Sequence, residues 1–211
     1  MRPEAILVGR TPESIATLAA EYADRVADVA PRGPVRLLGW SFGGSLALLV
    51  AEELVRRGRE VTFVGMLDAR TDVVVDEEFD QDTVLASLLR EMGFPVDPGA
   101  TMTVDDAVAL VRTSGDAISI LDDVQIARVV ENYVASERLT AGADYGRYDG
   151  DVFFVDATRL EMDLTGVASD GWRDHVGGEL RVVALDCAHS ELMDAVVLDR
   201  LGPLIAAELT R

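Results

Sequence analysis

The segment 35–47 constrains the chain most, because a Gly-x-Ser-x-Gly pattern joins two stretches of different character. A short apolar run precedes Ser41, and an apolar segment with helical spacing begins at Phe42. Strand, Gly-x-Ser-x-Gly and helix in this order predict a nucleophile elbow, which holds its serine in a strained, exposed turn. We expect any side chain at Gly39 or Gly43 to collide with the neighbouring strand or helix. We expect the backbone N–H of Phe42, at the helix N-terminus, to face a developing negative charge.

A second apolar segment, 61–67, follows the predicted helix after a short connection and ends at Asp68. Strand, helix and strand with short links predict a βαβ unit, and hence a parallel sheet buried on both faces. Functional side chains in such sheets lie just beyond the carboxyl ends of the strands. We therefore expect Ser41 and Asp68 at the same edge.

Two later segments also have strand character. Residues 151–155 end at Asp156, and residues 180–185 lead through Asp186, Cys187 and Ala188 to His189. If both join the parallel sheet, Asp156 and His189 lie at the edge that carries the serine.

The other segments have helical spacing. A helix is expected to begin at Thr11-Pro12-Glu13, with Thr11 as its N-cap and Pro12 as its first residue, and its apolar face is expected to run from Ile15 to Val29. A short strand is expected at 5–8, before it, and a last helix at 191–209. Helical patterns also fill the middle of the chain, at 82–92, 104–112 and 124–137.

The middle region, 71–148, has no convincing strand and is expected to form a helical lid inserted into the sheet domain. The resulting fold class is α/β, with a mostly parallel sheet. The first part of its core is 1–70, and the last part is 149–211.

Composition excludes several functions. A formal net charge of −19 argues against binding nucleic acid or an anionic membrane. The single cysteine, Cys187, excludes an internal disulfide, suits a reducing cytoplasm and is expected to be a buried structural thiol. No signal peptide is recognisable, and the longest uncharged stretch, 37–51, is too short to span a bilayer. No histidine or cysteine cluster suggests a metal, and no glycine-rich phosphate loop suggests a cofactor.

A serine hydroxyl needs a base within hydrogen-bond reach and an acid that orients the base. Of the two histidines, His189 is expected at the serine's edge, whereas His175 lies in a polar loop before a strand, at the opposite edge. Asp186 is too close to His189 along the chain to reach its far nitrogen easily. Asp68 and Asp156 both follow strands at the correct edge, and spacing alone leaves both open as the acid.

From Thr11 onwards the chain resembles the thioesterase domains that release products from nonribosomal peptide synthetases and, more loosely, polyketide synthases. The resemblance is carried, in the same order, by Pro34–Gly44, Met66–Ala69, Gly150–Phe154, Trp172 and His189–Met193. It implies an α/β-hydrolase fold, a catalytic triad of Ser41, Asp68 and His189, and a mobile helical lid. It also implies that a phosphopantetheinyl carrier domain delivers the acyl or peptidyl substrate and that the enzyme itself binds no cofactor.

The N-terminus departs from that family, whose members begin with further strands and a His-Pro-x-Gly-Gly loop. That loop supplies half of the oxyanion hole, and nothing before Thr11 matches it. Phe42 can supply one donor. Either the chain is an incomplete version of the fold, or Ala5–Gly9 and a partner chain replace the rest.

Three functions are compatible with these features. The first is a thioesterase that releases a carrier-bound chain by hydrolysis or cyclisation through an acyl-serine. The second is a free-standing editing thioesterase that clears mischarged carriers. The third is a catalytically impaired module that binds carriers or other partner proteins.

Overall fold

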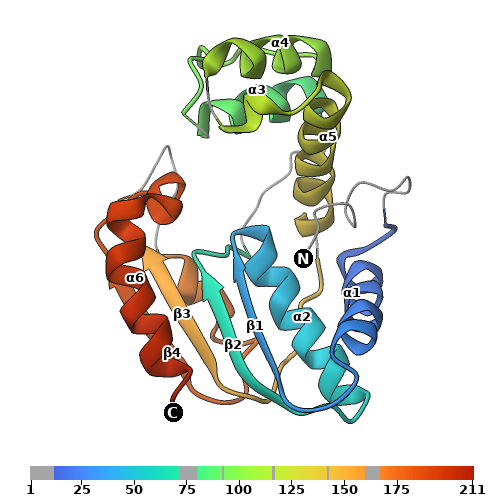
Figure 1. The fold of residues 1–211 in the computed structure, drawn as a ribbon, viewed down its shortest axis with the longest axis vertical. Helices are drawn as coiled ribbons and strands as arrows, with labels where there is room; N and C mark the ends of the chain where they lie inside the picture. The colour runs from blue at the N-terminus through green and yellow to red at the C-terminus, as the bar shows by residue number, and fades with distance from the viewer. Residues whose placement is uncertain (1–11, 72–79, 92, 116, 142, 160–166) are drawn as a thin grey trace. The chain divides into compact units, whose positions relative to one another are not determined.

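A computed structural model describes residues 12–71, 80–91, 93–115, 117–141, 143–159 and 167–211 (Figure 1). The described residues form two compact units. One, the helical unit, comprises those between 80 and 141, and the other, the sheet unit, comprises 12–71 and those from 143 to 211. The strand expected at 5–8, the helix cap expected at Thr11 and the first part of the expected lid, 72–79, lie outside the described residues.

Within the described residues, four parallel strands form the sheet, in the order β1-β2-β3-β4. They are β1 (Val35–Trp40), β2 (Val61–Leu67), β3 (Val152–Ala157) and β4 (Leu180–Leu185). This confirms the predicted α/β fold with a parallel sheet. One boundary differs, because Asp156 is the fifth residue of β3 and does not follow its end.

Burial of the sheet is uneven. All six residues of β3 are buried, as expected for a strand covered on both faces. The two outer strands of the described sheet are more open, with Leu38 on β1 48% exposed and Val182 on β4 37% exposed. The prediction of burial on both faces therefore holds for the inner strand β3 and fails at the edges.

Three α-helices are described in the sheet unit: α1 (Ile15–Val29), α2 (Phe42–Arg56) and α6 (Ala195–Glu208) (Figure 1). Helix α2 packs against β1 and β2, and α1 packs against α2. Helix α6 contributes to the core at strands β3 and β4, because its Val197 and Leu201 belong to the apolar cluster that includes Phe153 and Leu185. These helices provide the core that holds the strand ends in place.

Helices α1 and α6 both begin later in the chain than predicted. Ser14 caps α1, because its hydroxyl accepts a hydrogen bond from the N–H of Thr17 at 3.1 Å. The apolar face of α1 also stops short of the predicted end, since Val29, its last residue, is 79% exposed. The last α-helix starts at Ala195, because Ser190–Met193 form the 3-10 helix η4 and Asp194 is extended.

The helical unit contains α3 (Gln81–Glu91), α4 (Val104–Ser114), the 3-10 helix η2 (Ala117–Ile120) and α5 (Asp123–Thr140). Two capping boxes start α4 and α5, formed by Thr103 with Asp106 and by Asp122 with Gln125. The unit has its own apolar core, in which Leu85, Leu89, Ala107, Val111, Ile126 and Val130 are buried. Its three α-helices match the three predicted helical patterns.

Residues 143–148, which the sequence assigns to the lid region, are grouped with the sheet unit. The Tyr148 N–H donates to the His175 carbonyl at 2.9 Å. The Tyr145 ring packs edge-on against Trp172, with centroids 4.7 Å apart. This segment therefore leads the chain back onto the sheet.

Candidate active site

Ser41 occupies the sharp turn between β1 and α2. Its φ of 54° and ψ of −129° lie in a region that a non-glycine residue rarely adopts. Two hydrogen bonds hold this backbone: the Ser41 N–H donates to the Leu67 carbonyl at 2.9 Å, and the Ser41 carbonyl accepts from the Gly44 N–H at 2.8 Å. The Ser41 hydroxyl makes no capping bond to α2. The turn has the geometry of a nucleophile elbow.

The glycines of the elbow have unequal roles. A Cβ on Gly39 would lie 1.9 Å from the carbonyl oxygen of Gly43, so this position requires glycine. A Cβ on Gly43 would meet no described atom within 4 Å, so the expected collision there is wrong. The close approach falls one residue later, where a Cβ on Gly44 would lie 2.8 Å from the Cβ of Ala69. The helix turns Gly44, and not Gly43, towards the end of β2.

Asp68 follows β2 directly and is held by three hydrogen bonds. Its backbone N–H donates to the Val155 carbonyl at 2.7 Å, and its Oδ1 accepts from the Ala157 N–H at 3.0 Å. Its Oδ2 lies 2.8 Å from Nδ1 of His189. Since an ionised carboxylate only accepts, Nδ1 carries the proton of that bond and Nε2 is the nitrogen that can accept one. Asp68 is 6% exposed and has a φ of 48°, again unusual for a non-glycine residue.

The loop that carries His189 follows β4 and is fastened to the end of β3. The Arg159 N–H donates to the Cys187 carbonyl at 3.0 Å. The Arg159 guanidinium forms ion pairs with Glu191 and, at 3.6 Å, with Asp186. Glu191 also accepts from the backbone N–H of Ala188 at 3.1 Å. These contacts could not be predicted from the sequence, since a surface arginine carries no recognisable pattern.

Asp156 makes different contacts from Asp68. Its carboxylate accepts from both the N–H and the hydroxyl of Ser169, at 2.9 and 2.6 Å. Burial raises the pKa of Asp156; the two hydrogen bonds from Ser169 oppose this increase, and the charge of Asp68 adds to it. Of the two aspartates that sequence spacing left open, Asp68 is the one hydrogen bonded to His189.

The other reactive side chains lie in structural settings. Nδ1 of His175 is 2.8 Å from the Gly146 carbonyl, and its ring packs against Tyr145 and Trp172. Cys187 is fully buried, as predicted, and burial raises the pKa of its thiol, with the charge of Asp68 adding to the increase. A buried thiol with a raised pKa is a poor nucleophile.

The described part of the chain shows no group of three or more histidine, cysteine or acidic side chains that could hold a metal ion. Among the same residues, no helix has both the length and the apolar character needed to cross a membrane.

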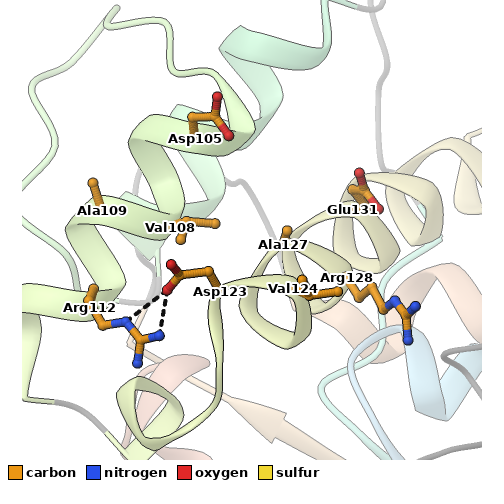
Figure 2. A pocket seen from close by; sticks show the side chains of 9 residues that line it. All are labelled: Asp105, Val108, Ala109, Arg112, Asp123, Val124, Ala127, Arg128 and Glu131. Carbon is orange, nitrogen blue, oxygen red and sulfur yellow. Dashed lines mark hydrogen bonds and ion pairs between the residues drawn. The ribbon is translucent and has the colours of Figure 1, made fainter.

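A groove of about 660 Å³ lies in the helical unit, between α4 and α5 (Figure 2). It is lined by Asp105, Val108, Ala109, Arg112, Asp123, Val124, Ala127, Arg128 and Glu131. Arg112 donates to Asp123 through Nε and Nη2, at 2.9 and 2.5 Å. Two of the charged side chains that line the groove are therefore paired with each other. None of its described lining residues is a serine or a histidine.

The family model of the thioesterase domain matches residues 7–204. The chain therefore belongs to the thioesterase domain family. It is 28% identical over 202 residues to the dimodular nonribosomal peptide synthase of Bacillus subtilis (strain 168), covering 94% of this chain and 8% of that protein. It is 27% identical over 187 residues to enterobactin synthase component F of Escherichia coli (strain K12), covering 86% of this chain and 13% of that protein. The chain thus spans a small fraction of the length of these relatives.

Solved structures of thioesterase domains share the fold. The covalent complex of the NocB thioesterase domain with a fluorophosphonate nocardicin G analogue matches with a TM-score of 0.67 and 24% identity, covering 98% of this chain and 80% of that chain. The surfactin thioesterase domain SrfTE matches with a TM-score of 0.61 and 20% identity, covering 92% and 75%. These similarities confirm the α/β-hydrolase fold expected from the sequence.

Proposed function

We propose that this domain is a serine thioesterase that releases an acyl or peptidyl chain from a carrier protein through an acyl-serine intermediate. The observation that carries the proposal is the 2.8 Å contact between Asp68 Oδ2 and His189 Nδ1. The same sheet unit contains the elbow at Ser41. Family membership and the synthases among its relatives support the substrate class.

In the proposed mechanism, His189 Nε2 takes the hydroxyl proton as Ser41 Oγ attacks the thioester carbonyl carbon. The carbon–sulfur bond then breaks, the proton passes to the departing thiolate, and the acyl group stays on Ser41. Water, or an amine or hydroxyl of the chain itself, attacks this ester and gives its proton to His189. His189 returns that proton to Ser41 Oγ, which restores the enzyme and yields a free acid or a ring. Asp68 orients the imidazole and stabilises its charged form throughout.

The developing oxyanion needs hydrogen-bond donors. Phe42 is the first residue of α2, so its N–H has no acceptor within the helix and is the donor that we assign. The phosphopantetheine arm belongs to the carrier, and we assign no cofactor to the domain itself. A cytoplasmic location, expected from the single cysteine, is part of the same proposal.

Intact mass after treatment with a serine-directed fluorophosphonate tests the proposal. One adduct is expected on the wild type and none on Ser41→Ala. Ser45→Ala is the matched control, because Ser45 lies one turn further along α2 and its buried hydroxyl has no partner among the described residues. A folded wild-type protein that takes up no adduct would contradict the enzymatic function and favour the partner-binding module.

Release and editing differ in their substrates, and a shared fold does not separate the two functions. Competing rates on peptidyl-loaded and acetyl-loaded carriers distinguish the two functions. Preference for the peptidyl carrier supports release, and preference for the acetyl carrier supports editing.

A further inference from the structure

The proposed mechanism leaves one buried carboxylate unused. Asp156 is 3% exposed, and both hydrogen bonds that the structure gives it come from Ser169, which is 1% exposed. Ser169 belongs to the 3-10 helix η3 (Ala168–Trp172). A buried charge is costly unless hydrogen bonds compensate it, so this contact fastens η3 firmly to β3.

The other end of η3 is fastened to the turn after β2. The indole Nε1–H of Trp172 donates to the Ala69 carbonyl at 2.7 Å, and Trp172 is fully buried. A Cβ on Gly171 would lie 2.0 Å from Oγ1 of Thr71, so glycine at this position lets the Thr71 side chain pack directly against η3. The segment therefore lies directly against the residues that follow Asp68.

These two attachments surround the contacts of Asp68. Asp156 stands between Val155, whose carbonyl accepts from the Asp68 N–H, and Ala157, whose N–H donates to Asp68 Oδ1. Ala69, held by Trp172, is the next residue after Asp68. A non-glycine residue at a φ of 48° persists only where its surroundings over-determine the conformation. The attachments of η3 hold Ala69, which follows Asp68, and Asp156, which lies between the two β3 residues bonded to Asp68.

We propose that η3, here called the acid brace, positions the Asp68 carboxylate for His189, and that Ser169 and Trp172 are its positioning residues. The proposal rests on the proposed function, in which Asp68 is the catalytic acid. Asp156 contributes by anchoring the brace. When the brace is loosened, the turn at Asp68 can relax, and the carboxylate and the imidazole lose their alignment.

Trp172→Phe and Ser169→Ala are the test variants. Phenylalanine keeps a ring against Tyr145 but removes the donor to Ala69. Alanine keeps the N–H of residue 169 but removes the hydroxyl bonded to Asp156. Leu54→Ala is the control for a general loss of core packing, because Leu54 is fully buried near the end of α2 and has no part in these contacts.

Two readouts separate positioning from stability. The first is the exchange rate of the His189 Nδ1 proton, measured from its signal in the downfield region of the proton NMR spectrum. This signal reports the Asp68–His189 hydrogen bond without requiring turnover. The second is the rate of fluorophosphonate labelling. We expect about tenfold faster proton exchange and about 10- to 100-fold slower labelling in Trp172→Phe, with smaller changes in the same direction in Ser169→Ala.

Wild-type proton exchange in Trp172→Phe would overturn the proposal, and so would equal changes in Leu54→Ala. If Trp172→Phe does not fold, Ser169→Ala decides, with unchanged exchange counting against the brace. If the wild type is not labelled, the proposed function fails, but the proton signal still tests the brace.

Discussion

The indole ring of Trp40 stacks on the imidazole ring of His189, with centroids 5.2 Å apart and planes 29° from parallel. Trp40 is the last residue of β1 and immediately precedes Ser41, so the residue before the proposed nucleophile contacts the proposed base. Together with the hydrogen bond that Nδ1 donates to Asp68, this stack fixes the ring from its face as well as from its edge. Trp40 therefore helps to orient His189.

We expect Trp40→Leu to reduce kcat/KM about 2- to 10-fold, because a stacked aromatic pair contributes about 0.5–1.5 kcal/mol. Trp40→Phe should keep most of the activity. It should not reduce stability much, since Nε1 of Trp40 is buried without an acceptor among the described residues. Steady-state kinetics and urea denaturation measure both effects. Phe63→Leu is the control, since it removes an aromatic pair with Phe153 elsewhere in the sheet; an equal loss of activity there would contradict a specific role for Trp40.

Asp68→Asn should reduce turnover about 10³- to 10⁴-fold, because an amide cannot stabilise the charged imidazole and favours the wrong tautomer. Asp156→Asn should cost about tenfold or less, since asparagine can still accept from the Ser169 N–H. Single-turnover rates on an acyl carrier compare the two. Full activity in Asp68→Asn, with a large loss in Asp156→Asn, would reverse the assignment of the acid.

Alanine substitutions in the elbow should rank in the order of their steric clashes. Gly39→Ala meets backbone at 1.9 Å and should prevent the native turn, with loss of fluorophosphonate labelling. Gly44→Ala meets the Ala69 side chain at 2.8 Å and should lower the free energy of unfolding by about 1–3 kcal/mol. Gly43→Ala should stay within about 0.5 kcal/mol of wild type. Urea denaturation gives the ranking, and a severe loss in Gly43→Ala would show that its open surroundings are filled.

Glu53 should make stability depend on acidic pH. Hydrogen bonds from Arg56 lower its pKa from 4.5 to about 2; burial opposes this decrease, and hydrogen bonds from Arg57 reinforce it. Between these values the unfolded chain binds a proton that the folded chain does not, so the contribution is complete above 4.5 and lost as pH falls towards 2. We expect Glu53→Gln to lower the free energy of unfolding by about 0.3–1 kcal/mol at pH 7, because Arg56 is largely exposed.

The difference between Glu53→Gln and wild type should shrink as the pH is lowered from 5 to 2. Denaturant titrations at several pH values in this range measure it. Glu21→Gln, at an exposed position of α1, is the control for the substitution itself. A pH-independent difference for Glu53→Gln would contradict the shifted pKa.

Elements with strong local patterns could be predicted from the sequence. Apolar runs ending at Trp40 and Leu67 became strands, and helical spacing at 104–112 and 124–137 became α4 and α5. Helix boundaries were less predictable where several neighbouring residues could each have served as the N-cap. At the start of α1, Ser14 was the cap, because its hydroxyl reaches the Thr17 N–H.

The contacts around the site depended on three-dimensional packing that no local pattern encodes. The sequence placed Asp68 and Asp156 after or near strand ends but did not reveal that the two carboxylates have different partners. The decisive contacts are the Ala157 N–H on Asp68 and the Ser169 hydroxyl on Asp156, and both bring together residues distant in the chain. The closeness of Gly44 to Ala69 similarly depends on how α2 is rotated against β2.

Strands β2 and β3 are neighbours in the sheet, although the chain between them includes the whole helical unit with its separate apolar core. The entropy of closing a loop grows only logarithmically with its length, and each doubling costs about 0.6 kcal/mol. The helical unit can therefore be lengthened, shortened or exchanged during evolution at little thermodynamic expense to the strands on either side of it. Diversification of the helical unit is thermodynamically separate from preservation of the elbow at Ser41 and of the Asp68–His189 contact in the sheet unit.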